Sequence, residues 1–264
     1  MIAAIIQART MSTRLPNKIL LPINDKPILY HFIERVRDAQ KLDDIIVATS
    51  TKKSDDIIEK FCIDNEIKCF RGSEEDVLSR YHEAAKKFSV DIIVRLTSDT
   101  PLLDPKVIDK VITKYQETKY DFVSNFFPLP RTYPDGYNIE VFSSKILEIV
   151  NQEAEKPSDR EHVTTYITMQ PKKFKIYRVD SEKNLSNYRL NLDYKEDFEL
   201  IKAVFEGLKD NKFKLEDIIN WLDNHPEILK LNSGIKPYEN LLKSFEDDKK
   251  LGFKPYKKNF YLDQ

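Results

Sequence analysis

The sequence has 264 residues, of which 33 % are charged and 41 % hydrophobic, and its formal net charge is -1. A chain of this length can bury a substantial core and forms either one large domain or one domain with an appendage. The nearly neutral charge excludes a global attraction to nucleic acid or to anionic membranes, so an anion site must be a local cluster of cations, and we expect small molecules as partners.

The two cysteines, Cys62 and Cys69, are too few for a disulfide framework and wrongly spaced for a metal knuckle. No run approaches the roughly 20 apolar residues of a membrane span. The first apolar stretch is too short, and followed by too many charges, for a signal peptide. We therefore expect a cytoplasmic protein that does not enter a membrane.

The first 120 residues alternate short apolar runs with stretches in which apolar residues recur at helical spacing. Asp104-Pro105, for example, combines an N-cap with a proline at the first helical position. Four such alternations predict an α/β fold with a Rossmann-like, mostly parallel sheet and helices on both faces. The predicted strands are 2–6, 45–49, 67–70 and 91–96, and the predicted helices begin at 27, 54, 73 and 104.

From Pro128 onward the pattern becomes irregular, beginning with a turn-rich loop over 128–136. We expect a domain over 1–230 that includes a small β arm at about 128–185 and a helical C-terminal segment. The tail, 231–264, has weak periodicity and is predicted to be irregular and to pack on the body or on a partner. The further predicted strands are 121–127, 138–142, 174–179 and 189–193, and the further predicted helices are 143–155, 196–208 and 214–229.

The loop that follows the first strand is rich in cations and hydroxyl groups. It contains Arg9, Arg14 and Lys18, with Ser12 and Thr13 between them. A solvated basic turn is one interpretation. The position favours a polyanion site, because ligands of open α/β sheets bind at the carboxyl ends of the strands.

Two aspartates, Asp99 and Asp193, each follow a predicted strand and so belong at the same edge of the sheet. Carboxylates that face a cationic loop suit Mg²⁺ bridging to nucleotide phosphates, although a turn or helix cap is the simpler interpretation of Asp99. The matching chemistry is displacement at phosphorus, in which cations and metal stabilise spread negative charge. Lys18, Arg9 and Arg14 are then the catalytic candidates, because they would hold the triphosphate and the departing pyrophosphate.

Six motifs follow one another at 7–18, 70–81, 99–102, 131–136, 160–164 and 189–193. Together they resemble the SpsF-like nucleotidyltransferases of spore coat polysaccharide biosynthesis, relatives of the acylneuraminate and 3-deoxy-manno-octulosonate cytidylyltransferases. The resemblance covers roughly 1–245 and implies a GT-A-type nucleotide-binding fold, CTP as donor, Mg²⁺ dependence, and transfer of CMP to an acidic sugar or related acceptor. It also implies a homodimer in which the region 138–179 forms an arm between subunits.

The resemblance divides the site residues into a nucleotide group, an acceptor group and a metal pair. The metal pair is Asp99 and Asp193. His162 is either a general base for an acceptor hydroxyl or a structural hydrogen-bonding residue. The nucleotide group is Ala8, Arg9, Ser12, Arg14, Lys18, Arg71, Thr97 and Asp99, and the acceptor group is Tyr133, Asp135, Gly136, Glu140, Arg160, His162 and Arg189.

The chain departs from the family pattern at two positions of the first loop. Met11 and Asn17 stand where the family commonly has glycine. Glycine allows a positive φ, which asparagine tolerates and methionine adopts poorly. We therefore expect the loop to follow a somewhat different path around the phosphates.

Other functions fit the sequence less well. A glycosyltransferase of the same fold normally has an Asp-x-Asp metal motif, whereas the strand here ends in Ser98-Asp99-Thr100. A non-catalytic nucleotide-binding protein is suggested only by the missing loop glycines. A nicotinamide dehydrogenase is disfavoured because the five glycines are scattered and form no Gly-x-Gly-x-x-Gly motif.

Overall fold

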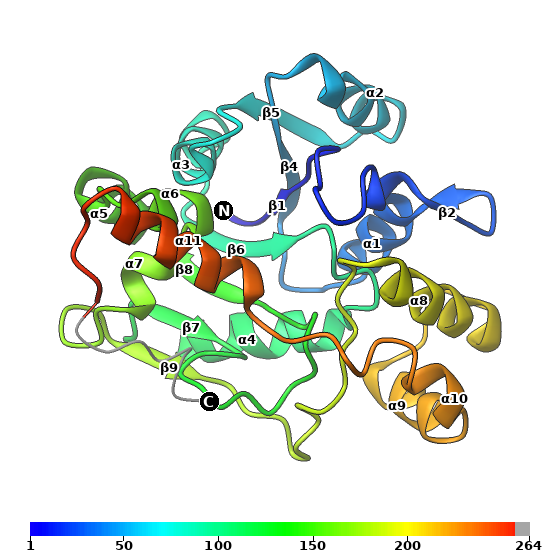
Figure 1. Ribbon diagram of the computed structural model, residues 1–264. Helices are drawn as coiled ribbons and strands as arrows, with labels where there is room; N and C mark the ends of the chain where they lie inside the picture. The colour runs from blue at the N-terminus through cyan, green and yellow to red at the C-terminus, as the bar shows by residue number, and fades with distance from the viewer. Residues whose placement is uncertain (257–264) are drawn as a thin grey trace.

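The computed structural model describes residues 1–256 and contains one seven-stranded sheet with helices on both faces (Figure 1). The strand order is β5-β4-β1-β6-β8-β7-β9. The first four strands of this order are mutually parallel, β8 is antiparallel to both of its neighbours, and β7 and β9 are parallel. The predicted α/β fold with a mostly parallel sheet is confirmed. The strands are β1 Ile2–Gln7, β4 Asp44–Ser50, β5 Lys68–Gly72, β6 Ile92–Thr97, β7 Phe122–Ser124, β8 Glu140–Ser143 and β9 Ile176–Arg178, and a separate hairpin joins β2 Pro22–Ile23 to β3 Lys26–Pro27.

The central strand β1 marks the point at which the strand order reverses. After β1 the chain continues to β4 and β5 on one side and then returns to β6 on the other, so that Gln7 lies between Ala48 and Thr97. Such a reversal opens a crevice beyond the carboxyl ends of the two diverging strands. The loops that follow β1 and β6 therefore face each other.

The alternation of side chains along β1 divides the core into two layers. Ala4 and Ile6 pack into a layer covered by α1, α4, α8 and α9, whereas Ala3 and Ile5 pack against α3 and α5. All four side chains are fully buried. The helices are α1 Ile28–Arg37, α2 Asp56–Asp64, α3 Val77–Lys87, α4 Pro105–Glu117, α5 Ser144–Glu153, α6 Pro157–His162, α7 Thr165–Thr168, α8 Lys195–Leu208, α9 Leu215–Asp223, α10 Pro226–Leu229 and α11 Glu239–Lys250, with short 3₁₀ turns at Lys18–Leu20 and Lys53–Asp55.

Two predicted regions differ from the structure. The segment 189–193 is extended but is not a strand, because its ladder is limited to a single bridge between Arg189 and Asp135. Residues 128–185, expected to form an arm, contribute β8 and β9 to the main sheet, where β8 pairs with β6 and β7. These two strands therefore belong to the main sheet, and the arm between subunits stays a prediction.

The C-terminal region contains more helix than the sequence predicts. The helix predicted over 214–229 is divided into α9 and α10, because Pro226 cannot continue the preceding helix. In the tail predicted to be irregular, Glu239–Lys250 form α11, which lies across the front of the molecule near α6 (Figure 1). Within residues 1–256 no helix combines the length and the apolar character needed to cross a bilayer.

Candidate active site

A cavity of about 570 Å³ opens at the carboxyl ends of β1 and β6. Its walls come from the loops after these strands, from α6 and α7, from the segment 189–194, and from the first turn of α11. The structure thus brings together twelve of the residues predicted for the site. They are Ala8, Arg9, Ser12, Arg14, Lys18, Thr97, Asp99, Asp135, Glu140, His162, Arg189 and Asp193.

The ammonium group of Lys18 joins the two predicted metal ligands. Its Nζ lies 2.8 Å from Asp99 Oδ2 and 2.9 Å from Asp193 Oδ1, and it also donates to the Leu192 carbonyl at 2.7 Å. Burial alone would lower the pKa of Lys18, but the two carboxylates outweigh it and raise the pKa above its usual value. Lys18 is therefore a fixed positive charge in the floor of the site.

Backbone contacts explain how Asp193 reaches Asp99 from a distant part of the chain. Leu192 N–H donates to the Asp99 carbonyl at 2.8 Å, and Leu190 N–H donates to the Asp135 carbonyl at 2.7 Å. The buried Leu190 and Leu192 side chains fix the segment on the core. The segment 189–193 is thus tied to two neighbouring loops, which is why it does not continue as a ladder.

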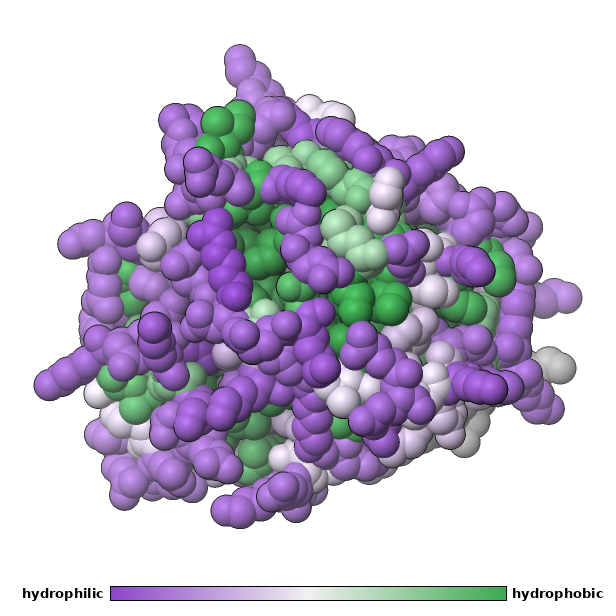
Figure 2. All heavy atoms as spheres, turned by 180° about the vertical axis from the view of Figure 1, so that it is seen from behind, coloured by the Kyte–Doolittle hydropathy of each residue, from purple (hydrophilic) through white to green (hydrophobic). Residues whose placement is uncertain are grey.

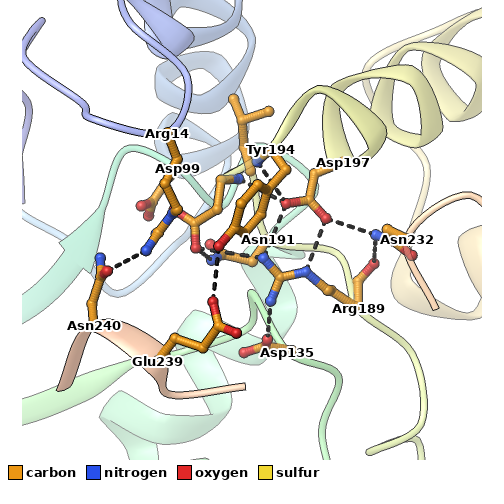
Figure 3. A network of polar contacts seen from close by, with 12 residues as sticks. Arg14, Asp99, Asp135, Arg189, Asn191, Tyr194, Asp197, Asn232, Glu239 and Asn240 are labelled. Atoms are coloured by element: carbon orange, nitrogen blue, oxygen red, sulfur yellow. Dashed lines mark hydrogen bonds and ion pairs between the residues drawn. The ribbon is translucent and has the colours of Figure 1, made fainter. Parts of the chain in front are cut away.

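A network of polar contacts, which includes Arg14, Arg189 and Asn191, surrounds the site (Figure 3), and Asp193 is one of its members. Arg14 Nη2 lies 2.6 Å from Asp193 Oδ1, and the Asn191 side chain donates to Oδ2 at 2.8 Å. Burial opposes ionisation of Asp193, but Lys18 and Arg14 together lower its pKa. Asp193 is therefore ionised at neutral pH despite its burial.

Arg189 connects the wall of the site to the start of α8. Its guanidinium contacts Asp135 at 2.9 Å and Asp197 at 2.9 and 3.0 Å. Burial would lower the pKa of Arg189, but these carboxylates raise it. Asn232 donates to Asp197 at 2.8 Å and completes the cluster. Arg189 is thus fixed by the carboxylates of Asp135 and Asp197, and it holds the segment 189–194 in place in the wall of the cavity.

The path of the first loop answers the question raised by the missing glycines. Asn17 has a φ of 57°, so the position that is commonly glycine does require the left-handed conformation, and asparagine supplies it. Met11 is absent from the positions with positive φ and its side chain is 60 % exposed. The loop is anchored instead at Thr10, whose N–H and hydroxyl donate to Asp55 Oδ1 at 2.8 and 2.7 Å.

His162 reaches the cavity from the end of α6. Its Nε2 lies 3.0 Å from Ser244 Oγ on α11. Burial lowers the pKa of His162 to about 4, and the positive charges of Arg95 and Arg9 act in the same direction against the opposing charge of Glu161. The imidazole is therefore neutral at pH 7.

Four predicted site residues lie outside the cavity lining. Arg71 is paired with Asp56 and Glu59 on α2, each at 2.8 Å, and the buried Tyr133 contacts Lys110 on α4 at 3.3 Å. The other two stabilise neighbouring structure rather than face the cavity. Arg160 binds Asp76 at 2.7 Å and caps the end of α5 through Asn151, and Gly136 has a φ of 93° where the backbone passes Leu190 and Asn191.

Comparison with known proteins identifies the family. Residues 3–225 match the family model described as Cytidylyltransferase. The chain belongs to the cytidylyltransferase family. The spore coat polysaccharide biosynthesis protein SpsF of Bacillus subtilis is 34 % identical over 84 % of this chain and 94 % of its own. This confirms the resemblance seen in the motifs.

Two further relatives match this chain over most of its length. An uncharacterized protein of Methanocaldococcus jannaschii is 38 % identical over 89 % of this chain and 96 % of its own. The solved structure of a cytidylyltransferase from Leptospira borgpetersenii has a TM-score of 0.84 and 35 % identity, covering 89 % of this chain and 98 % of its own. The architecture around the cavity is thus that of the family.

Several residues that line the cavity were not predicted from the sequence. Arg95, partly buried on β6, pairs with Glu140 and donates to Gln7 Oε1 at 3.0 Å. An arginine inside an apolar run needs a partner of opposite charge, so the sequence around Arg95 could have indicated an ion pair at this strand. Glu239 and Asn240 carried no such signal, because they lie in a tail without clear periodicity.

The carboxylates of the candidate site fit a cation that would be shared with substrate phosphates. Within residues 1–256 no group of three or more His, Cys, Asp or Glu side chains is arranged to hold a metal ion. Asp99 and Asp193, however, converge on the same Lys18 Nζ, so their oxygens face a common point. Mg²⁺ is commonly held by one or two carboxylates together with water and substrate phosphates. The pair fits that pattern.

Proposed function

We propose that the protein transfers CMP from CTP to an acidic sugar or a related acceptor and releases pyrophosphate, for the synthesis of a surface polysaccharide or glycoconjugate. The observation that carries the proposal is the convergence of Lys18, Asp99 and Asp193 where the strand order reverses. Membership of the cytidylyltransferase family supports CTP as donor, and the name of the Bacillus subtilis relative supports the biosynthetic role.

The cations of the first loop have distinct roles in this proposal. Arg14 and Lys18 are already ordered by Asp193 and would contact the triphosphate with little loss of side-chain freedom. The Arg9 side chain makes no hydrogen bond or ion pair with the rest of residues 1–256 and is exposed at the cavity. It is therefore available to the phosphates. Together these groups stabilise the charge that develops on departing pyrophosphate.

Asp99 and Asp193 would hold Mg²⁺ together with the phosphates of CTP. A cation bound there would neutralise phosphate charge and orient the triphosphate. Lys18 holds the two carboxylates in place, so the protein's own contribution is to preorganise them.

The acceptor is expected on the side of the cavity formed by Glu140 and His162. His162 is neutral at pH 7, but a pKa of about 4 makes it a weak base. Its contact with Ser244 favours the hydrogen-bonding role over the general-base role. Glu140 is paired with Arg95 and accepts from Thr164 Oγ1 at 2.5 Å, so it shapes the floor of this half.

A screen for pyrophosphate release tests the proposal. Each nucleoside triphosphate is combined with a library of acidic sugars and with small phosphorylated or phosphonate acceptors. We expect release that requires CTP, Mg²⁺ and one class of acceptor, and that is lost in Asp99→Asn. CTP binding by calorimetry without release over the whole panel would favour a non-catalytic nucleotide-binding protein. Consumption of a nucleotide sugar would favour a glycosyltransferase.

We also propose that the protein acts as a homodimer. On the face opposite to that of Figure 1, apolar side chains gather in patches between charged ones (Figure 2). Patches of this kind commonly mark contacts between proteins. Light scattering should give about twice the chain mass of 31.1 kDa, and a monomeric mass would contradict the proposal.

A further inference from the structure

The helix α11 lies beyond the part of the chain that matches the family. The family match ends at residue 225, whereas α11 begins at Glu239. Even so, Tyr238, Glu239, Asn240 and Leu241 line the cavity. An element beyond the residues that the family model matches thus forms part of the wall of the site.

Buried contacts along α11 hold this wall in place. Phe245 packs into an apolar cluster with Phe126, Phe127 and Met169. Further along the helix, the buried Asp248 accepts hydrogen bonds from the backbone and the hydroxyl of Ser158 on α6, at 3.1 and 2.5 Å. The anchored half of α11 therefore fixes the position of its first turn.

The first turn of α11 reaches across the cavity to the loop that follows β1. Figure 3 shows the Asn240 side chain directed at Arg14, to whose Nη1 its Oδ1 is hydrogen-bonded. Beside it, Tyr194 OH donates to Glu239 at 2.8 Å. These two contacts connect α11 with the loop after β1, which carries the predicted triphosphate residues, and with the segment 189–194, which carries the predicted metal ligand Asp193.

Arg14 is consequently held on three sides. Asp193 binds Nη2 at 2.6 Å, Asn240 binds Nη1, and the guanidinium lies 5.1 Å from the centre of the Tyr194 ring. Asp193 alone would hold one edge of the guanidinium, and Asn240 fixes the other edge without adding charge. An arginine that is ordered before binding loses less rotamer freedom when it contacts a phosphate.

We propose that Asn240 is a positioning residue for the nucleotide, which acts through Arg14 by holding its guanidinium ready for the triphosphate. This inference rests on the proposed function. It makes α11 a part of the nucleotide site in this chain, although the helix lies outside the family match.

The test compares CTP binding, in the presence of Mg²⁺, by calorimetry. We expect Asn240→Ala to bind CTP about five- to tenfold more weakly, where tenfold corresponds to about 1.4 kcal/mol. The matched control is Asn220→Ala, an exposed asparagine on α9 outside the cavity lining, which should bind like the wild type. In turnover, Asn240→Ala should raise KM for CTP and leave KM for the acceptor unchanged.

A double-mutant cycle separates positioning from a general structural effect. In an Arg14→Ala background, Asn240→Ala should cause no further loss of CTP affinity. Equal losses in both backgrounds would overturn the inference, as would unchanged or tighter CTP binding by Asn240→Ala in the wild-type background. A wild-type protein that binds none of the four nucleoside triphosphates would overturn the proposed function itself, and the inference with it.

Discussion

Replacing Lys18 by methionine tests the centre of the proposed site. Methionine keeps most of the aliphatic stem but removes the charge that both carboxylates share. Breaking a fully buried ion pair costs about 3–5 kcal/mol. The Asp99 side chain is 25 % exposed, and Asp193 keeps its contact with Arg14, so we expect a smaller loss of about 1–3 kcal/mol in the free energy of unfolding.

The effect on turnover should be larger than this loss of stability suggests. Removing one group that stabilises developing negative charge commonly costs about 10²–10³ in kcat, or about 2.7–4 kcal/mol. We therefore expect Lys18→Met to stay folded and to release pyrophosphate about 10²–10³ times more slowly at saturating CTP. The assays are urea unfolding followed by tryptophan fluorescence and continuous detection of pyrophosphate.

The control is Lys145→Met, because Lys145 is exposed on α5 and remote from the cavity lining. It should match the wild type in both assays. If Lys18→Met retained kcat within about threefold while losing stability, Lys18 would hold the carboxylates only as a structural group, and its assignment to the triphosphate would be refuted.

Three further predictions concern the groups around Lys18. The pKa of Asp193 is lowered in the folded protein, so its ionisation stabilises the fold above the unfolded pKa of about 3.9. This stabilisation is lost as the pH falls through the folded pKa. Urea unfolding from pH 6 to pH 3 should therefore show that the difference in stability between wild type and Asp193→Asn shrinks below about pH 4. Gly136→Ala should destabilise the protein by about 1–3 kcal/mol and weaken CTP binding, because residue 136 has a φ of 93° and a Cβ would lie 2.6 Å from the Leu190 backbone. The control is Gly234→Ala, because Gly234 has open space around it. This control should change neither the free energy of unfolding nor the affinity for CTP measured by calorimetry. Removal of divalent cations with a chelator should weaken CTP binding in calorimetry at least about tenfold, and equal affinity with and without the cation would contradict the two-carboxylate site.

The fold and the centre of the site were predictable because they depend on local pattern and on strand order. Alternating apolar runs gave the parallel half of the sheet, and parallel strands place their carboxyl ends at one edge. The loop after β1 and Asp99 after β6 meet for that reason. The segment 189–193 was predicted to be a strand, but it forms only a single bridge. Alternating burial of Leu190 and Leu192 indicates an extended backbone and does not indicate whether another strand pairs with it.

Two residues predicted for the acceptor, Arg160 and His162, lie in different places for a geometric reason. Arg160 and His162 are two residues apart on α6 and so point to different sides of the helix. His162 therefore faces the cavity while Arg160 binds Asp76 on the other side. The position of α11 could not be predicted from the sequence either. A charged helix with few apolar residues is held in place by residues that are distant in the chain, such as those of the Phe245 cluster and Ser158.

The negative charges of the site are balanced by positive charges of the same site, and this balance should determine which form of the nucleotide binds best. Asp99 and Asp193 face Lys18 and Arg14, so the cations proposed for the phosphates are the same cations that balance the carboxylates proposed for the metal. A triphosphate that drew both cations away would leave two partly buried carboxylates without charge partners, which is costly. Under the proposed function, a divalent cation held by Asp99 and Asp193 would reduce this cost, because it would balance the charge of the two carboxylates. If the protein binds CTP as proposed, the pairing of these side chains should favour the metal-bound nucleotide over the metal-free nucleotide.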